Sequence, residues 1–231
     1  ANKELEHSNK ELDDFAYIAS HDLKAPLRAV RNLSQWIQDD LADKLEDETE
    51  ELMDLMDSRL TRMERMLDDL LAYSRMGQET DKASQEIVAG DILLKDVLAL
   101  LSLKENCAVT ISPAFSHIRV KRMPLQQVFL NLISNALKHN NKKKCCIRVT
   151  CQEELERYVF FVEDNGPGIA KENQEKIFEM FHTLKSRDEL EGSGIGLAVV
   201  KKAISMQGGG IFLTSQMGKG SNFSFTWPKE P

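Results

Sequence analysis

The chain has 231 residues and a formal net charge of −7 at pH 7, with 42% hydrophobic and 29% charged residues. These values are typical of a globular protein with one or two domains, and the acidic balance argues against a general nucleic-acid binder, which would be basic. No apolar run approaches the roughly 18 residues of a membrane span and no signal peptide is visible, so we expect no membrane span in this chain.

None of the four cysteines has the spacing of a zinc site. Cys107 stands alone, Cys145 and Cys146 are adjacent, and Cys151 follows in a strand-like segment. We interpret them as small hydrophobic residues in a reducing cytosol, and we therefore expect this portion of the protein to be cytoplasmic.

Residues 1–43 are predicted to form one long helix, because apolar residues recur through it at steps of three and four. Leu5 and Leu12 lie one heptad apart among charged residues, as in a helix that enters from a coiled coil. The chain begins at Ala1 inside this pattern, so we expect it to be a fragment of a longer protein.

Within this helix, His21 and Asp22 are followed by Pro26. A proline in a helix interior costs about 3 kcal/mol and cannot donate a hydrogen bond to the carbonyl four residues earlier, so we expect a kink or loosening beside the histidine. A neutral imidazole is a competent nucleophile near pH 7, and a neighbouring carboxylate can fix its tautomer and accept its proton. The pair is therefore a candidate catalytic pair, and the alternative is an ordinary surface histidine on an amphipathic helix.

The charged stretch around residues 43–48, with candidate caps at Asp47 and Thr49, predicts a turn and a second helix. Residues 49–76 then carry a broad stripe of leucine and methionine at helical period. Two long helices with a short join make a hairpin, and one hairpin cannot bury both stripes. We therefore predict a homodimer in which two hairpins form a four-helix bundle.

Residues 77–86 contain no large apolar residue and are predicted to be a linker, which divides the chain into domains 1–78 and 79–231. In the second domain Asp91 is the expected N-cap of the first helix, and Gly208–Gly210 is expected to end the last. Strands are predicted over 87–88, 107–112, 118–121, 146–152, 158–163, 211–215 and 222–227, and helices over 92–103, 124–139 and 194–207. Interleaved strands and helices predict an α/β domain with helices on one face of a mixed sheet.

Four polar residues lie on roughly one side of the predicted helix 124–139, namely Asn131, Asn135, Lys138 and His139. Asparagine oxygens are hard ligands for a magnesium ion that also holds phosphates, and the lysine can meet the phosphates themselves. The alternative is a polar outer face of the helix.

The sequence from Asp164 to Ile169, Asp-Asn-Gly-Pro-Gly-Ile, directly follows a predicted strand. Asp-Asn-Gly alone is most often a turn, but here a second glycine and an apolar residue follow, and no partner strand does. This favours a ligand loop in which glycine lets the backbone approach closely, and the carboxylate of Asp164 can accept a hydrogen bond from an exocyclic amine such as that of adenine.

Gly192, Gly194 and Gly196 precede the last predicted helix. Glycine-rich backbone at a helix N-terminus exposes N–H groups to a phosphate, although the pattern is neither a Walker nor a Rossmann sequence and is weak by itself. The long segment 171–191, with Phe178 and Phe181 among many charges, has no firm structural signal and is a candidate lid over a ligand.

In their order, these patterns resemble the transmitter core of two-component sensor histidine kinases, and the resemblance covers nearly the whole chain. The matching segments are Ser20–Leu27 for the H-box, Asn131–His139 for the N-box, Asp164–Gly168 and Gly192–Gly196 for the two glycine boxes, Phe178–Phe181 for the F-box, and Gly218–Phe223 for the last pattern, near the adenine pocket.

The resemblance implies a dimeric four-helix bundle followed by an α/β sandwich ATP-binding domain of the Bergerat fold, as in gyrase, heat-shock chaperones and MutL. It implies ATP and Mg²⁺ as cofactors and transfer of the γ-phosphoryl group to His21, with Asp22 as orienter and proton acceptor. The phosphoryl group would then pass to an aspartate of a response-regulator receiver domain, and a sensor domain would precede the chain.

The resemblance also implies roles for the site residues. Asp164 takes the adenine amine, Asn135 with Asn131 holds the magnesium, and Lys138 and His139 reach the phosphates. The other nucleotide-binding residues that it implies are Gly166, Gly168, Ile169, Phe178, Gly192, Gly194, Gly196, Leu197 and Ser221.

The chain departs from the family at Ala25, where a Thr or Asn associated with dephosphorylating the partner is common, so we expect weak phosphatase activity at most. Asp22 replaces the commoner Glu, which we expect to be tolerated. Two other interpretations remain at this stage: a non-enzymatic dimerising module that binds ATP only as a structural ligand, and an ATPase of the chaperone or mismatch-repair kind.

Overall fold

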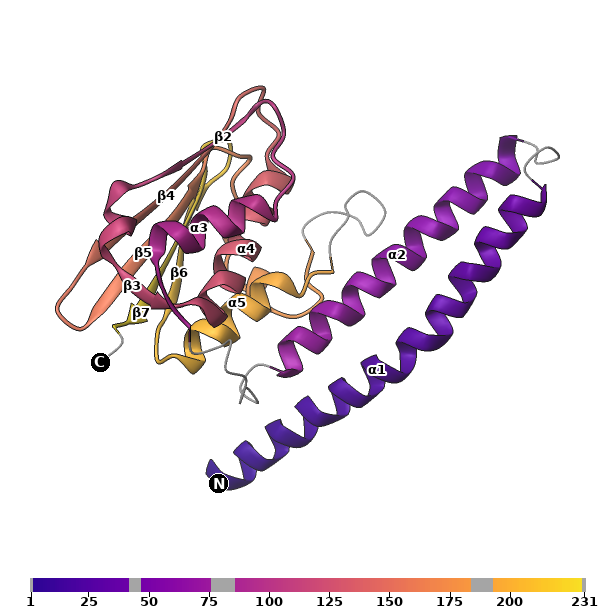
Figure 1. Ribbon diagram of the computed structural model, residues 1–231, viewed down its shortest axis with the longest axis horizontal. Helices are drawn as coiled ribbons and strands as arrows, with labels where there is room; N and C mark the ends of the chain where they lie inside the picture. The colour runs from indigo at the N-terminus through magenta and orange to yellow at the C-terminus, as the bar shows by residue number, and fades with distance from the viewer. Residues whose placement is uncertain (1, 42–46, 76–85, 184–192, 230–231) are drawn as a thin grey trace. The chain divides into compact units, whose positions relative to one another are not determined.

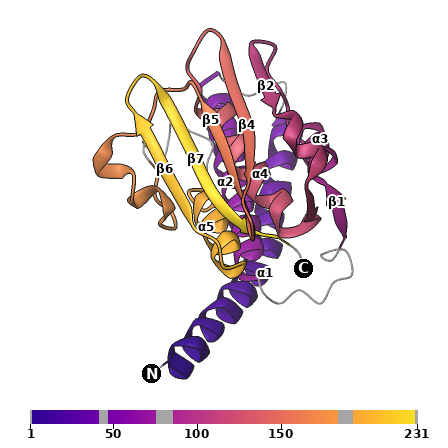
Figure 2. The ribbon, with the colours of Figure 1, turned by 90° about the vertical axis from the view of Figure 1, so that its left-hand side faces the viewer.

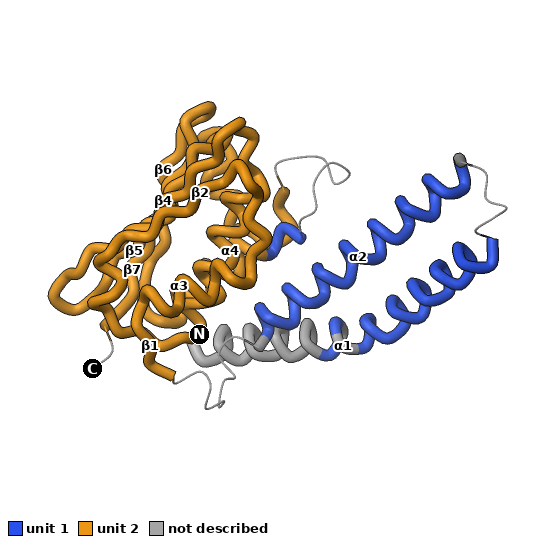
Figure 3. Tube along the Cα trace, turned by 45° about the horizontal axis from the view of Figure 1, so that its top comes forward, with its two compact units in different colours: residues 1–76, 185–195 blue, residues 77–184, 196–231 orange. Residues whose placement is uncertain are grey.

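The computed structural model describes residues 2–41, 47–75, 86–183 and 193–229, and the chain falls into two compact units (Figures 1 and 3). The first unit contains residues 1–76 and 185–195, and the second contains residues 77–184 and 196–231. The predicted linker 77–86, apart from Glu86, lies outside the described residues, as do residues 42–46 of the predicted turn.

The first unit is a helical hairpin of α1 (Asn2–Leu41) and α2 (Asp47–Arg75), as predicted. The helices are antiparallel, because Lys24 of α1 pairs with Asp68 of α2 while Arg31, two turns later, reaches back to residues 57–64. The guanidinium of Arg31 lies 2.5 Å from Glu64 Oε2 and donates to Thr61 Oγ1 at 3.1 Å. Helix α1 continues through Pro26 without a break in its helical assignment.

The second unit is built on a five-stranded sheet in the order β2-β4-β5-β7-β6. Only the β2–β4 pair is parallel among the strand pairs of this sheet. Its strands are β2 (Cys107–Ile111), β4 (Cys145–Glu153), β5 (Arg157–Asp164), β6 (Ile211–Gln216) and β7 (Gly220–Pro228). A separate two-stranded sheet joins β1 (Ile87–Ala89) to β3 (Arg119–Lys121).

Three helices cover one face of the large sheet, α3 (Gly90–Ala99), α4 (Arg122–His139) and α5 (Gly196–Met206) (Figures 1 and 2). Short 3-10 helices span Pro113–His117, Lys171–Asn173 and Lys176–Phe178. The predicted α/β domain with helices on one face of a mixed sheet is therefore confirmed. Among the described residues, no helix combines the length and apolar character that would let it cross a membrane.

The core between sheet and helices centres on aromatic rings. Phe160 of β5 and Phe225 of β7 are fully buried, and their ring centroids lie 5.2 Å apart. Phe129 of α4 packs on both, at 5.4 and 5.6 Å. Because such rings contribute large apolar areas and specific packing geometry, they fix how α4, β5 and β7 meet.

The start of α3 differs from the prediction. Ala89, the last residue of β1, occupies the N-cap position without a side-chain cap, so Asp91 is not the N-cap. Asp91 instead lies in the first turn, where its carboxylate accepts a hydrogen bond from Lys95 Nζ at 2.9 Å. The helix starts early because β1 runs directly into it and the Gly90 N–H donates to Ile118 O. It also ends at Ala99, short of residue 103.

The cysteines also require a correction. Cys107 and Cys145 face each other in the β2–β4 register, with Cα atoms 4.4 Å apart, and are joined by a disulfide. The interpretation of these two as separate small hydrophobic residues is therefore wrong, because only the parallel pairing of the strands brings them together. Cys146 and Cys151 are free, and burial raises the pKa of the Cys151 thiol to about 11.

We predict that reducing this disulfide lowers the free energy of unfolding of the second unit by about 2–4 kcal/mol, because the bond closes a 38-residue separation in the unfolded chain. Thermal unfolding with and without a dithiol reductant measures the effect. The double variant Cys107→Ser/Cys145→Ser should unfold at the lower temperature under both conditions, whereas Cys151→Ser should keep the response to reductant. Equal unfolding temperatures of the oxidised and reduced parent chain would contradict the prediction.

Candidate functional site

Helix α4 places the predicted magnesium and phosphate residues on one side, as expected from their spacing. Asn131, Asn135 and Lys138 are half-buried, and His139 is exposed at the C-terminal end of the helix. The Asn131 Nδ2 donates to the Gln127 carbonyl at 3.1 Å, so its Oδ1 is the candidate ligand atom.

Gly196, at the start of α5, meets Asn131 directly. A Cβ atom added to this glycine would lie 3.1 Å from Asn131 Oδ1, which is tighter than an ordinary contact. The structure therefore brings the N-box helix and the last glycine of the 192–196 pattern together, and the missing side chain keeps the amide oxygen accessible. Magnesium keeps several waters and takes one or two protein oxygens beside phosphates, so amide oxygens on α4 fit this ion.

Asp164 ends β5 and lies opposite Ser221 of β7 in the antiparallel register. Its Oδ1 accepts a hydrogen bond from the Gly166 N–H at 2.7 Å. A Cβ on residue 166 would lie 2.7 Å from the same oxygen, so a larger residue there would require the carboxylate to shift. Burial raises the pKa of Asp164 above its ordinary value, and the charge of Glu163 acts the same way, while the N–H groups of Gly166 and Ser221 oppose the rise. A half-buried carboxylate at a strand end is suited to accept a hydrogen bond from an amine of a bound ligand.

Two further glycines let backbone segments cross beside Asp164. A Cβ on Gly168, which has φ +75°, would lie 2.1 Å from Gln216 O. A Cβ on Gly220, with φ +105°, would lie 1.9 Å from Asp164 O. These glycines are required by the packing of the loop against the β6–β7 turn, whatever they contribute to a ligand.

Ser221 belongs to a hydroxyl pair that sequence analysis missed. Its Oγ lies 3.0 Å from Ser215 Oγ of β6, which donates to Gly220 O and accepts the Ile169 N–H at 2.8 Å. Ser215 thereby ties the predicted ligand loop to the sheet. Nothing in the sequence marks it, because its partners meet only through the pairing of β6 with β7.

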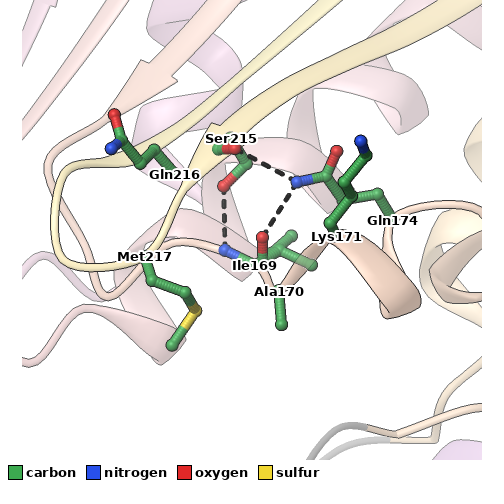
Figure 4. A pocket seen from close by; sticks show the side chains of 7 residues that line it. All are labelled: Ile169, Ala170, Lys171, Gln174, Ser215, Gln216 and Met217. Atoms are coloured by element: carbon green, nitrogen blue, oxygen red, sulfur yellow. Dashed lines mark hydrogen bonds between the residues drawn. The ribbon is translucent and has the colours of Figure 1, made fainter.

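A pocket of about 450 Å³ opens beside this loop (Figure 4). Gln174 lies at its wall and donates its Nε2 to the carbonyls of Ile169, at 2.9 Å, and Ser215, at 3.1 Å. The residues that line the pocket are Ile169, Ala170, Lys171, Gln174, Ser215, Gln216 and Met217. Of the predicted nucleotide-binding residues only Ile169 lines it, so this pocket does not unite the predicted site.

The remaining predicted residues have different settings. Phe178 is half-buried, with its ring edge-on to Phe223 of β7 at 6.4 Å and Lys201 Nζ 6.0 Å from its centroid. Gly194 has φ +71°, and Leu197 lies half-buried in the first turn of α5. Gly192 and residues 184–191 of the predicted lid lie outside the described residues.

His21 lies in α1, one turn before Pro26, and its side chain lies outside the described residues. Its neighbour Ser20 is buried, whereas Asp22 and Ala25 are exposed. The helix thus presents at least the carboxylate of the candidate catalytic pair to the outside of the hairpin.

Family comparisons account for both units. Residues 11–79 match the His Kinase A (phospho-acceptor) domain, and residues 120–231 match the histidine kinase-, DNA gyrase B- and HSP90-like ATPases. The chain belongs to the histidine kinases. Its hairpin is the phosphoacceptor domain of this family, and its second unit is the ATP-binding domain with the Bergerat fold.

Curated relatives of this histidine kinase core are similar along nearly all of it. The phytochrome-like protein Cph1 of Synechocystis is 35% identical over 98% of this chain and 30% of its own length. Cyanobacterial phytochrome B of Nostoc is 37% identical over 97% of this chain and 30% of its own length. The histidine kinase core therefore spans about 30% of the length of these relatives.

Solved structures agree with this histidine kinase core in fold. Full-length ShkA in complex with AMPPNP matches 94% of this chain and 46% of its own, with a TM-score of 0.70 and 25% identity. The catalytic domain of histidine kinase ThkA matches 62% of this chain and 95% of its own, with a TM-score of 0.53 and 28% identity.

We predict that Asp164→Asn weakens ATP binding by about tenfold to a hundredfold, because a hydrogen bond to a charged acceptor is lost. Affinity in the parent chain should fall as the pH is lowered towards the pKa of Asp164, since protonation converts the acceptor oxygen into a donor. Because burial raises that pKa, the loss should start at a higher pH than for an ordinary aspartate. Calorimetric titration with an ATP analogue across pH measures both effects.

Glu163→Gln is the matched control, because Glu163 is exposed beside Asp164 on the same strand. It should leave affinity nearly unchanged. An Asp164→Asn variant that bound the analogue as tightly as the parent chain would show that this carboxylate does not contact the base.

Proposed function

We propose that this chain is the transmitter core of a two-component sensor kinase. ATP bound by domain 79–231 phosphorylates His21 on domain 1–78, and the phosphoryl group then passes to an aspartate of a response-regulator receiver domain. The observation that carries the proposal is the combination, in one chain, of a phosphoacceptor helix with the His21–Pro26 motif and an ATP-binding domain with Asp164 and the α4 amides.

The nucleotide is held between the end of β5 and the end of α4. Asp164 accepts the adenine amine, while Lys138 and His139 at the end of α4 reach the phosphates. Amide oxygens of Asn135 and Asn131 would hold Mg²⁺, which supplies charge neutralisation at the phosphates. The glycines of the 192–196 pattern let the backbone approach the phosphates and act as a hinge for the candidate lid, residues 171–191.

Phosphoryl transfer needs positioning and charge neutralisation more than covalent work from the protein. One imidazole nitrogen of His21 attacks the γ-phosphorus, and the bond to the bridging oxygen of ADP breaks. The second nitrogen gives its proton to Asp22, whose carboxylate is exposed on α1. The linker around residues 77–86 must let the ATP-binding domain swing between its bound and docked positions.

Dimerisation is supported by the apolar surface of the hairpin. Among its described side chains, Leu60 and Leu71 are the buried large apolar residues. Those that are 39% to 62% exposed are Ile18, Leu23, Val30, Leu33, Trp36, Ile37, Leu41, Leu52, Leu55 and Met63. A second hairpin would cover such a surface, and a homodimeric four-helix bundle is the arrangement that does so.

The remaining partners follow from the family. A sensor domain upstream of residue 1 would supply the signal. This portion of the protein would work in the cytoplasm, where receiver domains are found and where the Cys107–Cys145 disulfide would be exposed to reduction. The acidic chain is not proposed to bind nucleic acid.

We expect acid-labile, base-stable label on the chain after incubation with γ-labelled ATP and Mg²⁺, and none on His21→Gln. The matched control is His117→Gln, an exposed histidine of the ATP-binding unit, which should label like the parent chain. Label that survives in His21→Gln would show that another residue is the acceptor.

Two outcomes of the same assay favour the rival functions. Steady ATP hydrolysis that His21→Gln does not change would indicate an ATPase of the chaperone or mismatch-repair kind. Tight nucleotide binding with neither label nor hydrolysis would indicate a non-enzymatic dimerising module.

We also predict that the chain accelerates, weakly at most, the dephosphorylation of a receiver domain that it has phosphorylated. Ala25, exposed one turn after His21, has no side-chain group to bond a water. Ala25→Thr should shorten the lifetime of the receiver phosphate, measured after removal of ATP, while His21 labelling is retained. Rapid dephosphorylation by the parent chain that depends on α1 would contradict this prediction.

A further inference from the structure

Asn165, between Asp164 and Gly166, uses both polar atoms of its side-chain amide. Its Oδ1 accepts hydrogen bonds from the Cys146 N–H and from Asn140 Nδ2, both at 2.9 Å. Its Nδ2 donates to the Lys144 carbonyl at 2.9 Å. One side chain thus links the loop after β5 to the start of β4 and to the residue that follows α4.

The orientation of both amides is dictated by backbone groups. The Cys146 N–H can only donate and the Lys144 carbonyl can only accept, so a single orientation of the Asn165 amide satisfies both. That orientation turns Oδ1 towards Asn140, which must present its NH₂ group. Asn140 Oδ1 then faces away and accepts the Lys142 N–H at 2.9 Å.

The strand that Asn165 binds is itself firmly held. Cys145, between the two residues that contact Asn165, is joined to Cys107 by the disulfide. The Cys145 N–H donates to Asn106 O at 2.9 Å. Lys144 and Cys146 therefore flank a residue that is held by two further bonds. The Asn165 backbone N–H also donates to the Cys146 carbonyl at 3.2 Å, so the side-chain bonds add to a backbone bond between the loop and β4.

The loop is also the element that carries Asp164. The Gly166 N–H donates to the Asp164 carboxylate within the turn, and the Asn165 side chain donates to the Lys144 carbonyl outside it. A Cβ on Gly166 would lie 3.7 Å from Asn140 Nδ2, so Asn140 also packs beside the turn. These contacts restrict the position of the turn at the end of β5.

We propose that Asn165 is a positioning residue that holds the Asp164 carboxylate in its nucleotide-binding orientation, and that Asn140 acts through Asn165. The proposal rests on the proposed function, since it assigns Asp164 to the adenine amine. Neither asparagine touches the nucleotide in this account. Their effect is on the affinity for ATP and not on the phosphoryl-transfer step.

Only asparagine meets every requirement at 165. Aspartate could accept from Cys146 and Asn140, but it cannot donate to Lys144 and adds a negative charge beside Asp164. Alanine leaves all three partners without the amide. Because the bonds to Cys146 and Lys144 lie at the surface, where water can replace them, the fold should tolerate either change.

The test uses the dimeric chain and two readouts: AMPPNP affinity by calorimetry, and the ATP dependence of His21 labelling. Asn165→Ala and Asn165→Asp should raise both the Kd for AMPPNP and the KM for ATP about tenfold, with the maximal labelling rate changed less than about twofold. Asn140→Ala should raise both constants by about threefold, because one bond to Asn165 is lost. Asn141→Ala, at the exposed neighbouring asparagine, is the matched control and should change neither constant.

The double variant Asn140→Ala/Asn165→Ala decides whether the two residues act together. It should bind AMPPNP as Asn165→Ala does, since Asn140 has lost the group through which it acts. A full additional loss would contradict that part of the proposal. Thermal unfolding of each variant shows which variants are folded. Asn140→Ala removes only one bond to Asn165, so it remains a test if Asn165→Ala fails to fold.

A merely structural role would give the opposite kinetic result. Loss of folded protein would lower the maximal labelling rate and leave KM and Kd unchanged, and this outcome would overturn the proposal. Folded Asn165→Ala with parent affinity would overturn it as well. Because AMPPNP affinity is measured without phosphoryl transfer, a failure of His21 to label would contradict the proposed function and leave this comparison decisive.

Discussion

The antiparallel pairing of β5 with β7 is the constraint on which the ATP-binding unit depends. Its register sets Phe160 opposite Phe225 and, at the end of the same strands, Asp164 opposite Ser221. A slip of one residue in either strand would turn its buried ring to the other face of the sheet, so the hydrophobic core favours one register. The position of the candidate adenine acceptor is thus a consequence of packing several residues away from it.

At that strand end, the backbone comes too close for side chains, and glycine is used where this happens. Gly168 and Gly220 let the loop of residues 164–169 and the β6–β7 turn pass close to each other beside Asp164. The hydroxyl groups of Ser215 and Ser221 are hydrogen-bonded at the same place. The Asn165 amide bonds the same loop to Cys146 of β4 and to Lys144 before it. The loop after Asp164 is therefore tied by hydrogen bonds to β4 and to Ser215 of β6, an arrangement that would keep the candidate acceptor oriented before a ligand arrives.

The two units differ in how they bury apolar surface. The ATP-binding unit closes its core within one chain, around Phe129, Phe160 and Phe225. The hairpin joins its helices through charged contacts such as Arg31 with Glu64, and leaves Trp36 62% exposed. These exposed apolar side chains support the proposed homodimer, in which a second hairpin would cover them.

The sequence by itself determined the long helices, the strand alternation, the α/β class and the order of motifs that identifies a histidine kinase, because periodicity and motif spacing are local properties. It did not determine the N-cap of α3. Because β1 runs straight into that helix, Ala89 is the N-cap and Asp91 lies in the first turn. Nor did it reveal the Cys107–Cys145 bond or the contact of Asn140 with Asn165, whose members lie 38 and 25 residues apart. Only tertiary structure decides such pairs, because sheet register and helix placement bring them together while nothing near either residue in the chain marks its partner.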